Sequence, residues 1–397
     1  MTDVLYKMTS NPINNLLIVG NFNSETGYAW KTISEYFYAL GELFISSGNH
    51  CYVCYPKVKE VPEALRGSDI TIEEFDFFKN SFTSLFFLIR NRNITVLYLT
   101  DRPAFSPRYI ICRLAGVKKI VIHDRTSGHR DSPGRIRSLA KKALQKYSFF
   151  SVDLAIGISD FVLRRLVGNN CIPVDRVVRV YNGVDVNKFM PSYDDYVFKK
   201  YGITPSKKVI FASSRANKYK GIQTLIEAAD IIVNEHRVED VAFLFCGDGP
   251  DIKHFRSMVS EKNLSKHFQC PGSSGDVQRI LRGIDIAVVP SVWQEGFGLS
   301  IIEGMATGKP VVATRVGGIV EIIEDGKDGI LFDPEDSKGL AEILLDLLRN
   351  ERLRGEIGCA ARNSAVEKWN IEDRKKDLVK VFRERVLDMI GQRCQLY

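Results

Sequence analysis

Short apolar runs alternate with longer amphipathic segments along most of the 397-residue chain. The first series of apolar runs occupies residues 15–20, 50–55, 94–100, 119–124, 153–159 and 177–183, and a helical pattern follows the first run from about Trp30 to Ser46. Strands that are separated by helical segments form βαβ units, and such units build parallel sheets. The alternation therefore predicts an α/β fold.

The alternation is interrupted at VDVNKFMPSYDD (residues 184–195), which is polar, contains a proline and has no period. It restarts with apolar runs at 208–214, 241–247, 284–291, 310–318 and 329–334, and a helical tail follows from Ser337. Domains cluster near ~100–200 residues, so a chain of this length is expected to contain two. We predict two doubly wound Rossmann-like domains, residues 1–190 and 191–373, that face a central cleft.

The composition is that of an ordinary soluble protein, with 45% hydrophobic and 26% charged residues. No uninterrupted apolar run reaches the ~18 residues of a transmembrane helix, and the polar start MTDVLYKMTSNPINN has no secretory core. The eight cysteines are scattered, and the one CxxC pair, Cys51 and Cys54, lies in a strand-like run without a second metal-binding pair. We therefore expect reduced structural cysteines and a cytoplasmic protein.

Positive charge is concentrated in the first half of the chain. The net charge is +7, but residues 88–150 hold 14 Arg or Lys and 3 acids. This excess indicates an anionic partner. The alternatives are a membrane surface, a phosphate-bearing ligand and nucleic acid. Residues 75–92 and 134–150 are apolar and basic, as in helices that lie on anionic lipid, and equally as in core-facing helices with a solvated basic face. Interleaved aromatic and basic RNA-binding motifs are absent from the sequence, which argues against nucleic acid.

Three polar loops follow predicted strands, where the ligands of open α/β sheets bind. They are HDRTSGHR (123–130), SSRANKYKG (213–221) and SVWQEGFGLSIIE (291–303). In the second loop, Arg215 offers a planar fork and Lys220 a point charge ahead of a helix N-terminus, which suits a phosphate group. The alternative is a pair of solvated cations on a surface loop.

The third loop sets two carboxylates, Glu295 and Glu303, around a glycine turn. Gly296 and Gly298 let the backbone approach a ligand closely, and the amides near Leu299 and Ser300 are free donors at a helix start. A carboxylate accepts two hydrogen bonds in a fork, so Glu303 suits the two hydroxyls of a ribose. A helix-dipole preference for acids explains one of the glutamates but not both.

The first loop begins with His123, which ends a strand and can bond a sugar hydroxyl or move a proton. A structural histidine is an equally good interpretation. Other nucleotide signals are missing from the sequence, because GNFNSETGY lacks GxGxxG and no GxxxxGK[ST] occurs. No cluster of His, Cys and Asp has metal-ligand spacing, so no metal is expected.

Several motifs together resemble the retaining nucleotide-sugar-dependent glycosyltransferases of the GT-B fold, family 4. They are VYNGVD, SSRANKYKG, FCGDGP, DIAVVPSVWQEGFGLSIIEGMATGKPVVATRVGGIVEII and DGKDGILFDPED, in that order between Val177 and Trp369. The spacing of Glu295 and Glu303 looks like the family's signature. The resemblance covers most of the chain, and it implies that the final helix, from about Arg374, packs back on the first domain.

The resemblance also implies roles for individual residues. By this comparison, Arg215 and Lys220 neutralise the donor diphosphate, Glu295 lies near the transferred sugar, and His123 is the acceptor-side histidine. The other implied donor contacts are Gly296, Phe297, Gly298, Leu299 and Ser300 at the sugar and phosphates, Glu303 at the ribose, and Cys270, Pro271 and Gly272 at the base.

The function that the resemblance implies is transfer of a hexose-type sugar, with retention, from a nucleotide diphosphate sugar to a glycan or lipid-linked glycan. UDP is favoured as the nucleotide, and neither a metal nor a cofactor is expected. The alternatives are a sucrose-type or sugar-phosphate synthase and a catalytically silent nucleotide-sugar-binding protein.

Two departures from the family pattern concern the acceptor side. The first loop carries Gly27 alone where many members have a glycine pair, so Gly27 is the candidate there. HDRTSGHR is unusually charged, and Asp124 and Arg125 are candidate acceptor contacts. Arg125, Ser127 and Arg130 can read an anionic acceptor.

Overall fold

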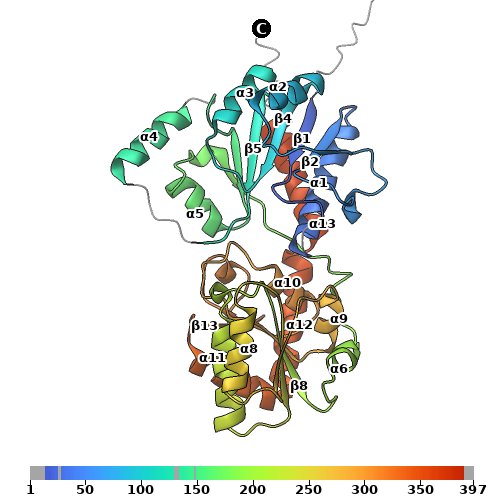
Figure 1. Cartoon of the computed structure of the whole chain (residues 1–397), viewed down its shortest axis with the longest axis vertical. Coiled ribbons are helices and arrows are strands. Elements are labelled where there is room, and N and C mark those ends of the chain that lie inside the picture. The colour runs from blue at the N-terminus through green and yellow to red at the C-terminus, as the bar shows by residue number, and fades with distance from the viewer. Residues whose placement is uncertain (1–13, 26–27, 129–133, 147–148, 389–397) are drawn as a thin grey trace, which may run out of the picture.

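The computed structural model describes residues 14–25, 28–128, 134–146 and 149–388. These residues form two lobes, each built on a parallel sheet (Figure 1). The first sheet has the order β3-β2-β1-β4-β5-β6-β7 and the second the order β10-β9-β8-β11-β12-β13. The predicted fold class, two doubly wound parallel α/β sheets, is confirmed.

The strands have the following bounds: β1 Asn15–Val19, β2 Cys51–Tyr55, β3 Thr71–Glu74, β4 Ile94–Thr100, β5 Lys119–Asp124, β6 Leu154–Gly157, β7 Val177–Arg179, β8 Lys208–Ser213, β9 Val241–Cys246, β10 Phe268–Gly272, β11 Ile286–Val289, β12 Val311–Thr314 and β13 Ile330–Phe332. The central strands are buried along nearly their whole length. Helices cover both faces of these sheets, which is why the strands are continuous apolar runs and not alternating ones.

The first lobe has helices α1 Tyr28–Ile45, η1 Glu63–Leu65, α2 Phe82–Asn91, α3 Pro107–Ala115, α4 Arg135–Lys146, α5 Asp160–Gly168 and η2 Val174–Arg176. The rest of the chain has α6 Tyr196–Tyr201, η3 Lys218–Lys220, α7 Ile222–Asp230, η4 Ile231–Glu235, α8 Ile252–Glu261, α9 Val277–Gly283, α10 Leu299–Ala306, η5 Ile319–Glu321, α11 Ser337–Arg349, α12 Glu351–Lys368, α13 Ile371–Phe382 and η6 Arg383–Leu387.

The chain crosses between the lobes at two places that run side by side. The amide of Val184 donates to the carbonyl of Trp369 at 2.8 Å, and the amide of Ile371 donates to the carbonyl of Val184 at 2.9 Å. Beyond the second crossing, α13 packs on α1 of the first lobe (Figure 1). The ring of Phe382 at the end of α13 lies 6.5 Å from that of Phe44, centroid to centroid. Helix α13 therefore returns the chain to the first lobe after the second crossing.

The described residues contain no helix that is both long enough and apolar enough to cross a membrane. Cys51 and Cys54 lie buried in β2, and burial raises the pKa of the Cys54 thiol to about 12. Both side chains therefore behave as small core residues.

Candidate active site

Glu295 is the point where the two lobes meet. It lies in the loop after β11 and is 7% exposed. Its Oε1 accepts hydrogen bonds from Lys220 Nζ at 2.5 Å and from Ser291 Oγ at 2.7 Å. Its Oε2 accepts a hydrogen bond from Ser127 Oγ of the first lobe at 3.2 Å. Residues from all three of the loops that the sequence singles out therefore gather at one carboxylate.

Gly296 lets the first lobe approach this carboxylate. Its amide donates to Ser127 Oγ at 3.0 Å, and its carbonyl accepts from Ser159 Oγ at 2.6 Å. A Cβ at position 296 would lie 2.8 Å from the carbonyl oxygen of Thr126, closer than real side chains come. The sequence predicts that this glycine lets a ligand approach the backbone closely. The structure shows the backbone of the opposite lobe in close contact with it.

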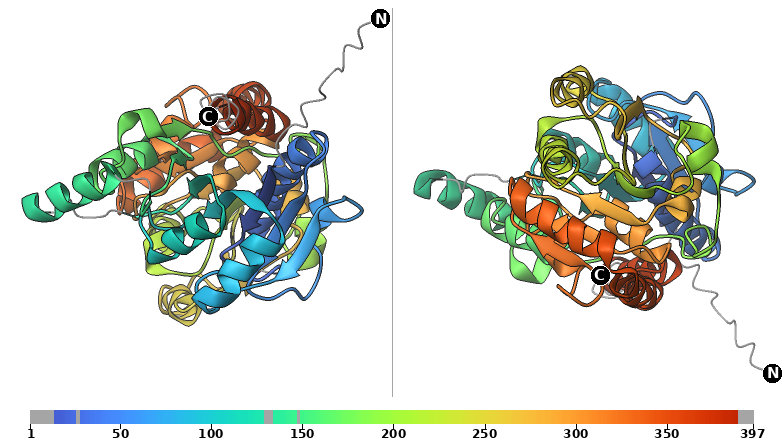
Figure 2. Two further views of the ribbon diagram at one scale, coloured as in Figure 1. Left: turned by 90° about the horizontal axis from the view of Figure 1, so that it is seen from above. Right: turned by 90° about the horizontal axis from the view of Figure 1, so that it is seen from below.

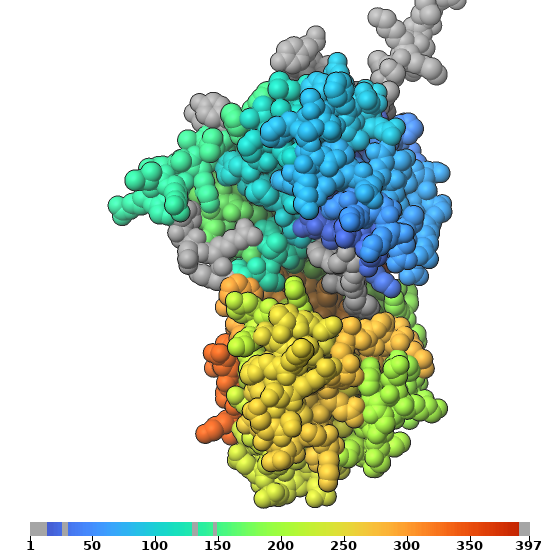
Figure 3. Space-filling model, viewed as in Figure 1, coloured from blue at the N-terminus to red at the C-terminus, as the bar shows by residue number. Residues whose placement is uncertain are grey.

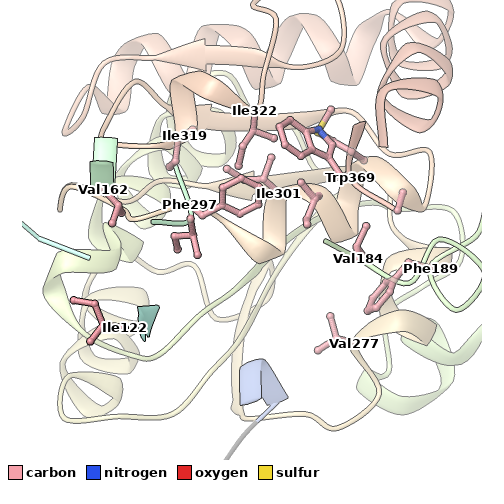
Figure 4. Close-up of a cluster of buried hydrophobic side chains, with 14 of the residues drawn as sticks. Ile122, Val162, Val184, Phe189, Val277, Phe297, Ile301, Ile319, Ile322 and Trp369 are labelled. Carbon is pink, nitrogen blue, oxygen red and sulfur yellow. The ribbon is translucent and has the colours of Figure 1, made fainter. Parts of the chain in front are cut away.

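Phe297 is turned into the core and not toward the cleft. Its ring lies beside that of Trp369 (Figure 4), with the two centroids 5.4 Å apart. The centroid of the Tyr181 ring lies 5.8 Å away. The next residue, Gly298, precedes α10, and no side chain caps this helix. Leu299 and Ser300 form its first turn, so their amides are the donors expected at a helix start. The aromatic packing fixes where this helix begins.

Glu303 lies one turn into α10 and is 6% exposed. It faces a cavity of about 580 Å³ that is lined from both lobes, including α1, the first crossing and the start of α13. Burial raises the pKa of Glu303 to about 7, against the opposing charge of Lys188. Within the described part of the chain, nothing donates a hydrogen bond to its carboxylate. Such a buried and unpaired acid is suited to accept hydroxyl groups from a ligand.

Arg215 and Lys220, the predicted clamp, stand on the loop between β8 and α7. Lys220 is bound to Glu295, whereas Arg215 is exposed and pairs with no acid of the described chain. The guanidinium is therefore free to receive an anion.

The predicted base contacts fall on the edge strand β10. Its pairing with β9 is irregular between Gln269 and Gly272, so the backbone around Pro271 is released from the ladder. The carbonyl of Cys270 accepts hydrogen bonds from Arg256, at 2.9 Å from Nε and 2.8 Å from Nη2. Gly272 adopts a φ of +107°, which only glycine takes easily.

His123 ends β5 and is completely buried. Its Nδ1 lies 2.6 Å from Tyr98 Oη and 3.2 Å from Arg125 Nη2. Arginine only donates, so Nδ1 accepts and the ring proton sits on Nε2, which has no partner among the described residues. Burial, followed by the charge of Arg125, holds the pKa of His123 well below its usual value. The histidine is therefore a neutral donor at neutral pH.

The remaining acceptor-side candidates are held by the protein itself. Asp124 forms an ion pair with Arg165 at 3.0 Å and accepts from Thr126. The guanidinium of Arg125 lies 4.7 Å from the centre of the Tyr36 ring and donates to Asn182 Oδ1. An anionic acceptor would have to displace these partners. Gly27 and Arg130 lie outside the described residues.

Sequence reasoning missed the part that Glu321 plays. Its carboxylate crosses from the second lobe to the start of α5 and accepts the amides of Asp160 and Phe161, each at 2.7 Å. No motif signals this contact, because it depends on how the lobes dock. Ser127 was named for acceptor binding, and its contact with Glu295 likewise follows from docking alone.

Comparison with known proteins covers both lobes. Residues 33–188 match the family described as Glycosyltransferase Family 4, and residues 195–364 match Glycosyl transferases group 1. An N-acetyl-alpha-D-glucosaminyl L-malate synthase of Bacillus anthracis is 32% identical over 200 residues, which is 50% of this chain and 51% of that protein. The chain thus spans about half the length of the curated relatives it matches.

Solved structures share the fold over nearly the whole chain. A glycosyltransferase from Rickettsia africae superimposes with a TM-score of 0.78 at 20% identity, covering 95% of this chain and 99% of that one. HepE of Anabaena superimposes with a TM-score of 0.75 at 18% identity, covering 93% and 99%. The family matches over both lobes show that the chain belongs to the glycosyltransferases of family 4, group 1, and the likenesses to solved structures show that it has the GT-B fold.

Proposed function

We propose that this protein is a metal-independent retaining glycosyltransferase. It moves a hexose-type sugar from a nucleotide diphosphate sugar, with UDP favoured, to a glycan or lipid-linked glycan. The observation that carries the proposal is the meeting of three loops at Glu295, where Lys220 pairs with the acid and Ser127 reaches it from the other lobe. Cytoplasmic location and contact with an anionic membrane surface are proposed separately from the transfer reaction.

The free cation of Arg215 and the amides that begin α10 stabilise the charge of the departing diphosphate, with Lys220 beside them. The bond between the anomeric carbon and the diphosphate oxygen breaks, and the acceptor oxygen bonds to the same face of that carbon. The acceptor's proton passes to the departing diphosphate. Glu303 accepts the ribose hydroxyls, and Glu295 accepts a hydroxyl of the transferred sugar.

Two of the proteins compared above support this choice of donor. The structure of HepE is described as a complex with UDP and glucose. The name of the Bacillus anthracis relative contains an N-acetyl-alpha-D-glucosaminyl group, which is a hexose-type sugar, and L-malate. A nucleotide diphosphate sugar donor fits the combination of Arg215, the α10 amides and the unpaired Glu303.

The test is calorimetric binding of a panel of nucleotide diphosphates and their sugars, without added metal, to wild type, Lys220→Ala and Lys218→Ala. Lys218 lies on the same turn with an exposed side chain, so it controls for loss of one positive charge. We expect one nucleotide to bind, and affinity to fall about tenfold or more in Lys220→Ala but not in Lys218→Ala.

Glu295→Gln then separates binding from transfer. This variant keeps the shape of the site and removes the negative charge beside the diphosphate position, so nucleotide binding should persist or tighten. We expect transfer to a glycan acceptor to drop by a factor of about 100 or more. Product analysis on the active enzyme distinguishes transfer to a glycan from sucrose-type or sugar-phosphate synthesis. Absence of binding by every nucleotide would overturn the proposal.

A further inference from the structure

Helix α4 stands away from the body of the first lobe. Both views of Figure 2 show it extending beyond the sheet, and it forms a ridge in the space-filling view (Figure 3). Most of its described side chains are exposed. A helix of 12 residues that is this poorly covered is marginal in water, since helices in proteins owe most of their stability to packing. We therefore expect that α4 is stabilised by a partner that covers its exposed face.

The face that α4 turns toward the protein is the polar one. Lys141 Nζ donates to the carbonyl of Asn169 at 2.7 Å, and Ser138 Oγ lies 3.6 Å from Cys171 Sγ. The carbonyl of Gln145 accepts a hydrogen bond from Arg176. Residues 138, 141 and 145 recur at helical spacing, so a single polar stripe attaches α4 to the segment after α5.

The opposite face is apolar and faces the solvent. Ile136 is 85% exposed, Leu139 is 68% exposed and Leu144 is 43% exposed. At 3.6 residues per turn these three side chains share one face of the helix, together with Ala140 and Ala143. The usual arrangement of a surface helix, apolar inward and polar outward, is reversed. An exposed apolar stripe of this kind marks an interaction site.

Positive charges border this stripe on both sides. With 3.6 residues per turn, Arg135 and Lys142 lie along one flank and Arg137 along the other, and all three are exposed. The helix RIRSLAKKALQK contains no acidic residue. A second copy of the same face would bring like charges together, whereas an anionic lipid surface accepts both the apolar stripe and its basic flanks.

We propose that α4 is an interfacial helix that docks on the surface of an anionic lipid bilayer, with its apolar stripe inserted among the lipids. The helix begins seven residues after Gly128, whose amide donates to the carbonyl of Gln294 at the meeting of the lobes. Docking therefore keeps the acceptor-side loop near the membrane and favours a lipid-linked acceptor. This last step, unlike docking itself, rests on the transferase function proposed above.

The test is co-sedimentation of the full chain with vesicles of phosphatidylcholine, with and without about 30% phosphatidylglycerol. Two variants address α4 separately: Arg135→Glu/Arg137→Glu/Lys142→Glu reverses the flanking charge, and Ile136→Ser/Leu139→Ser removes the stripe. Lys141 is left in place because it attaches the helix to the body. The matched control Lys253→Glu/Lys266→Glu/Lys338→Glu makes the same charge change at exposed positions of the second lobe.

We expect wild type and the control to bind the anionic vesicles, and both α4 variants to bind more than tenfold less. A dye attached at Ile136→Cys, in a background with Cys359→Ser because Cys359 is exposed, should shift to the blue with anionic vesicles and not with neutral ones. Circular dichroism and the thermal unfolding midpoint of each variant confirm that it is folded. Vesicle binding that is absent in wild type, or unchanged in the charge-reversal variant, overturns the docking proposal. Self-association of the wild type that the Ile136→Ser/Leu139→Ser change abolishes also overturns the docking proposal. The partner of the apolar stripe is then a second copy of the chain and not a bilayer.

The two proposals fail separately. If nucleotide binds and vesicles do not, the docking proposal is wrong and the transferase proposal is unaffected. If vesicles bind and no nucleotide does, the transferase proposal is wrong and the docking proposal is unaffected.

Discussion

Glu303 combines a position in the cleft with a shifted pKa, and the two together predict a pH dependence of nucleotide binding. Ribose hydroxyls donate to the ionised carboxylate, so binding favours the charged form. Because burial raises the pKa to about 7, the free protein holds a proton there below that pH and must release it on binding. We expect nucleotide affinity to rise about tenfold from about pH 6 to about pH 8. Calorimetry at several pH values checks this, with Glu303→Gln as the control that retains only the titration of the ligand.

The same carboxylate makes the folded protein less stable as the pH rises, whereas it makes nucleotide binding tighter. The folded protein binds the proton more tightly than the unfolded chain, whose pKa is near 4.5. The contribution of Glu303 to the free energy of unfolding is therefore fully present below about pH 4.5 and is lost as the pH rises through about 7. Glu303→Gln should then be more stable than wild type by about 1–3 kcal/mol at about pH 8, and nearly equal to it at about pH 4. Equal unfolding midpoints at pH 8 would contradict the assignment of a buried, unpaired acid.

At the level of residues, the sequence predicted which side chains carry charge but not which of them meet. The loop positions of Lys220 and Glu295 follow from the strand pattern, and their 2.5 Å contact is consistent with it. The inward turn of Phe297 could not be predicted, because its partner Trp369 is distant in the sequence and adjacent only after the second crossing forms. The roles assigned to the donor and acceptor residues stay predictions.

Among the elements, α5 is capped from both lobes: Ser159 Oγ of the first lobe accepts the amide of Val162, and Glu321 of the second lobe adds a carboxylate. Glu321 accepts two amides at the start of this helix, where a carboxylate also complements the helix dipole. Glu321→Gln removes the charge and keeps the shape, so we expect a loss of about 1 kcal/mol in unfolding free energy. Amide hydrogen exchange at Asp160 and Phe161 should become faster. Glu342→Gln, an exposed position on α11, is the control, and exchange that stays at the wild-type rate would show that the contact does not hold the lobes.

The strands that the sequence failed to predict are both edge strands. β3 (TIEE) and β10 (FQCPG) stand first in their sheets. A central strand such as β4 is buried on both faces and is therefore mostly apolar, so the sequence alone predicts it. An edge strand has one free side, so it can carry charges or a proline without losing its single ladder. Pairing with β2 and β9, and not local sequence, makes these two segments strands.

Considered as a whole, the molecule is two lobes joined by paired crossings and held together at the cleft by Ser127, Gln294 and Glu321. Gly296 is one place where this closed arrangement is sensitive to a single added atom. Each of the nearest neighbours of a Cβ at this position belongs to the other lobe: Thr126 O at 2.8 Å, Thr126 C at 3.3 Å and Arg125 O at 3.4 Å. Its backbone dihedral is not in the left-handed region, so alanine meets no local strain.

Gly296→Ala should therefore act as a wedge that pushes the lobes apart without unfolding either. We expect a larger radius of gyration in small-angle scattering and a fall in transfer rate of about tenfold to 100-fold, since a displacement of about 1 Å at the reacting groups is enough for that. Nucleotide affinity should change much less, because Arg215, Lys220 and Glu303 all belong to the second lobe. Gly355→Ala on α12, where an added Cβ has open space, is the matched control. Unchanged scattering together with an unchanged rate would mean that the contact of Gly296 with Thr126 is not needed for activity, and that the chemistry proceeds with the lobes further apart than they are in this structure.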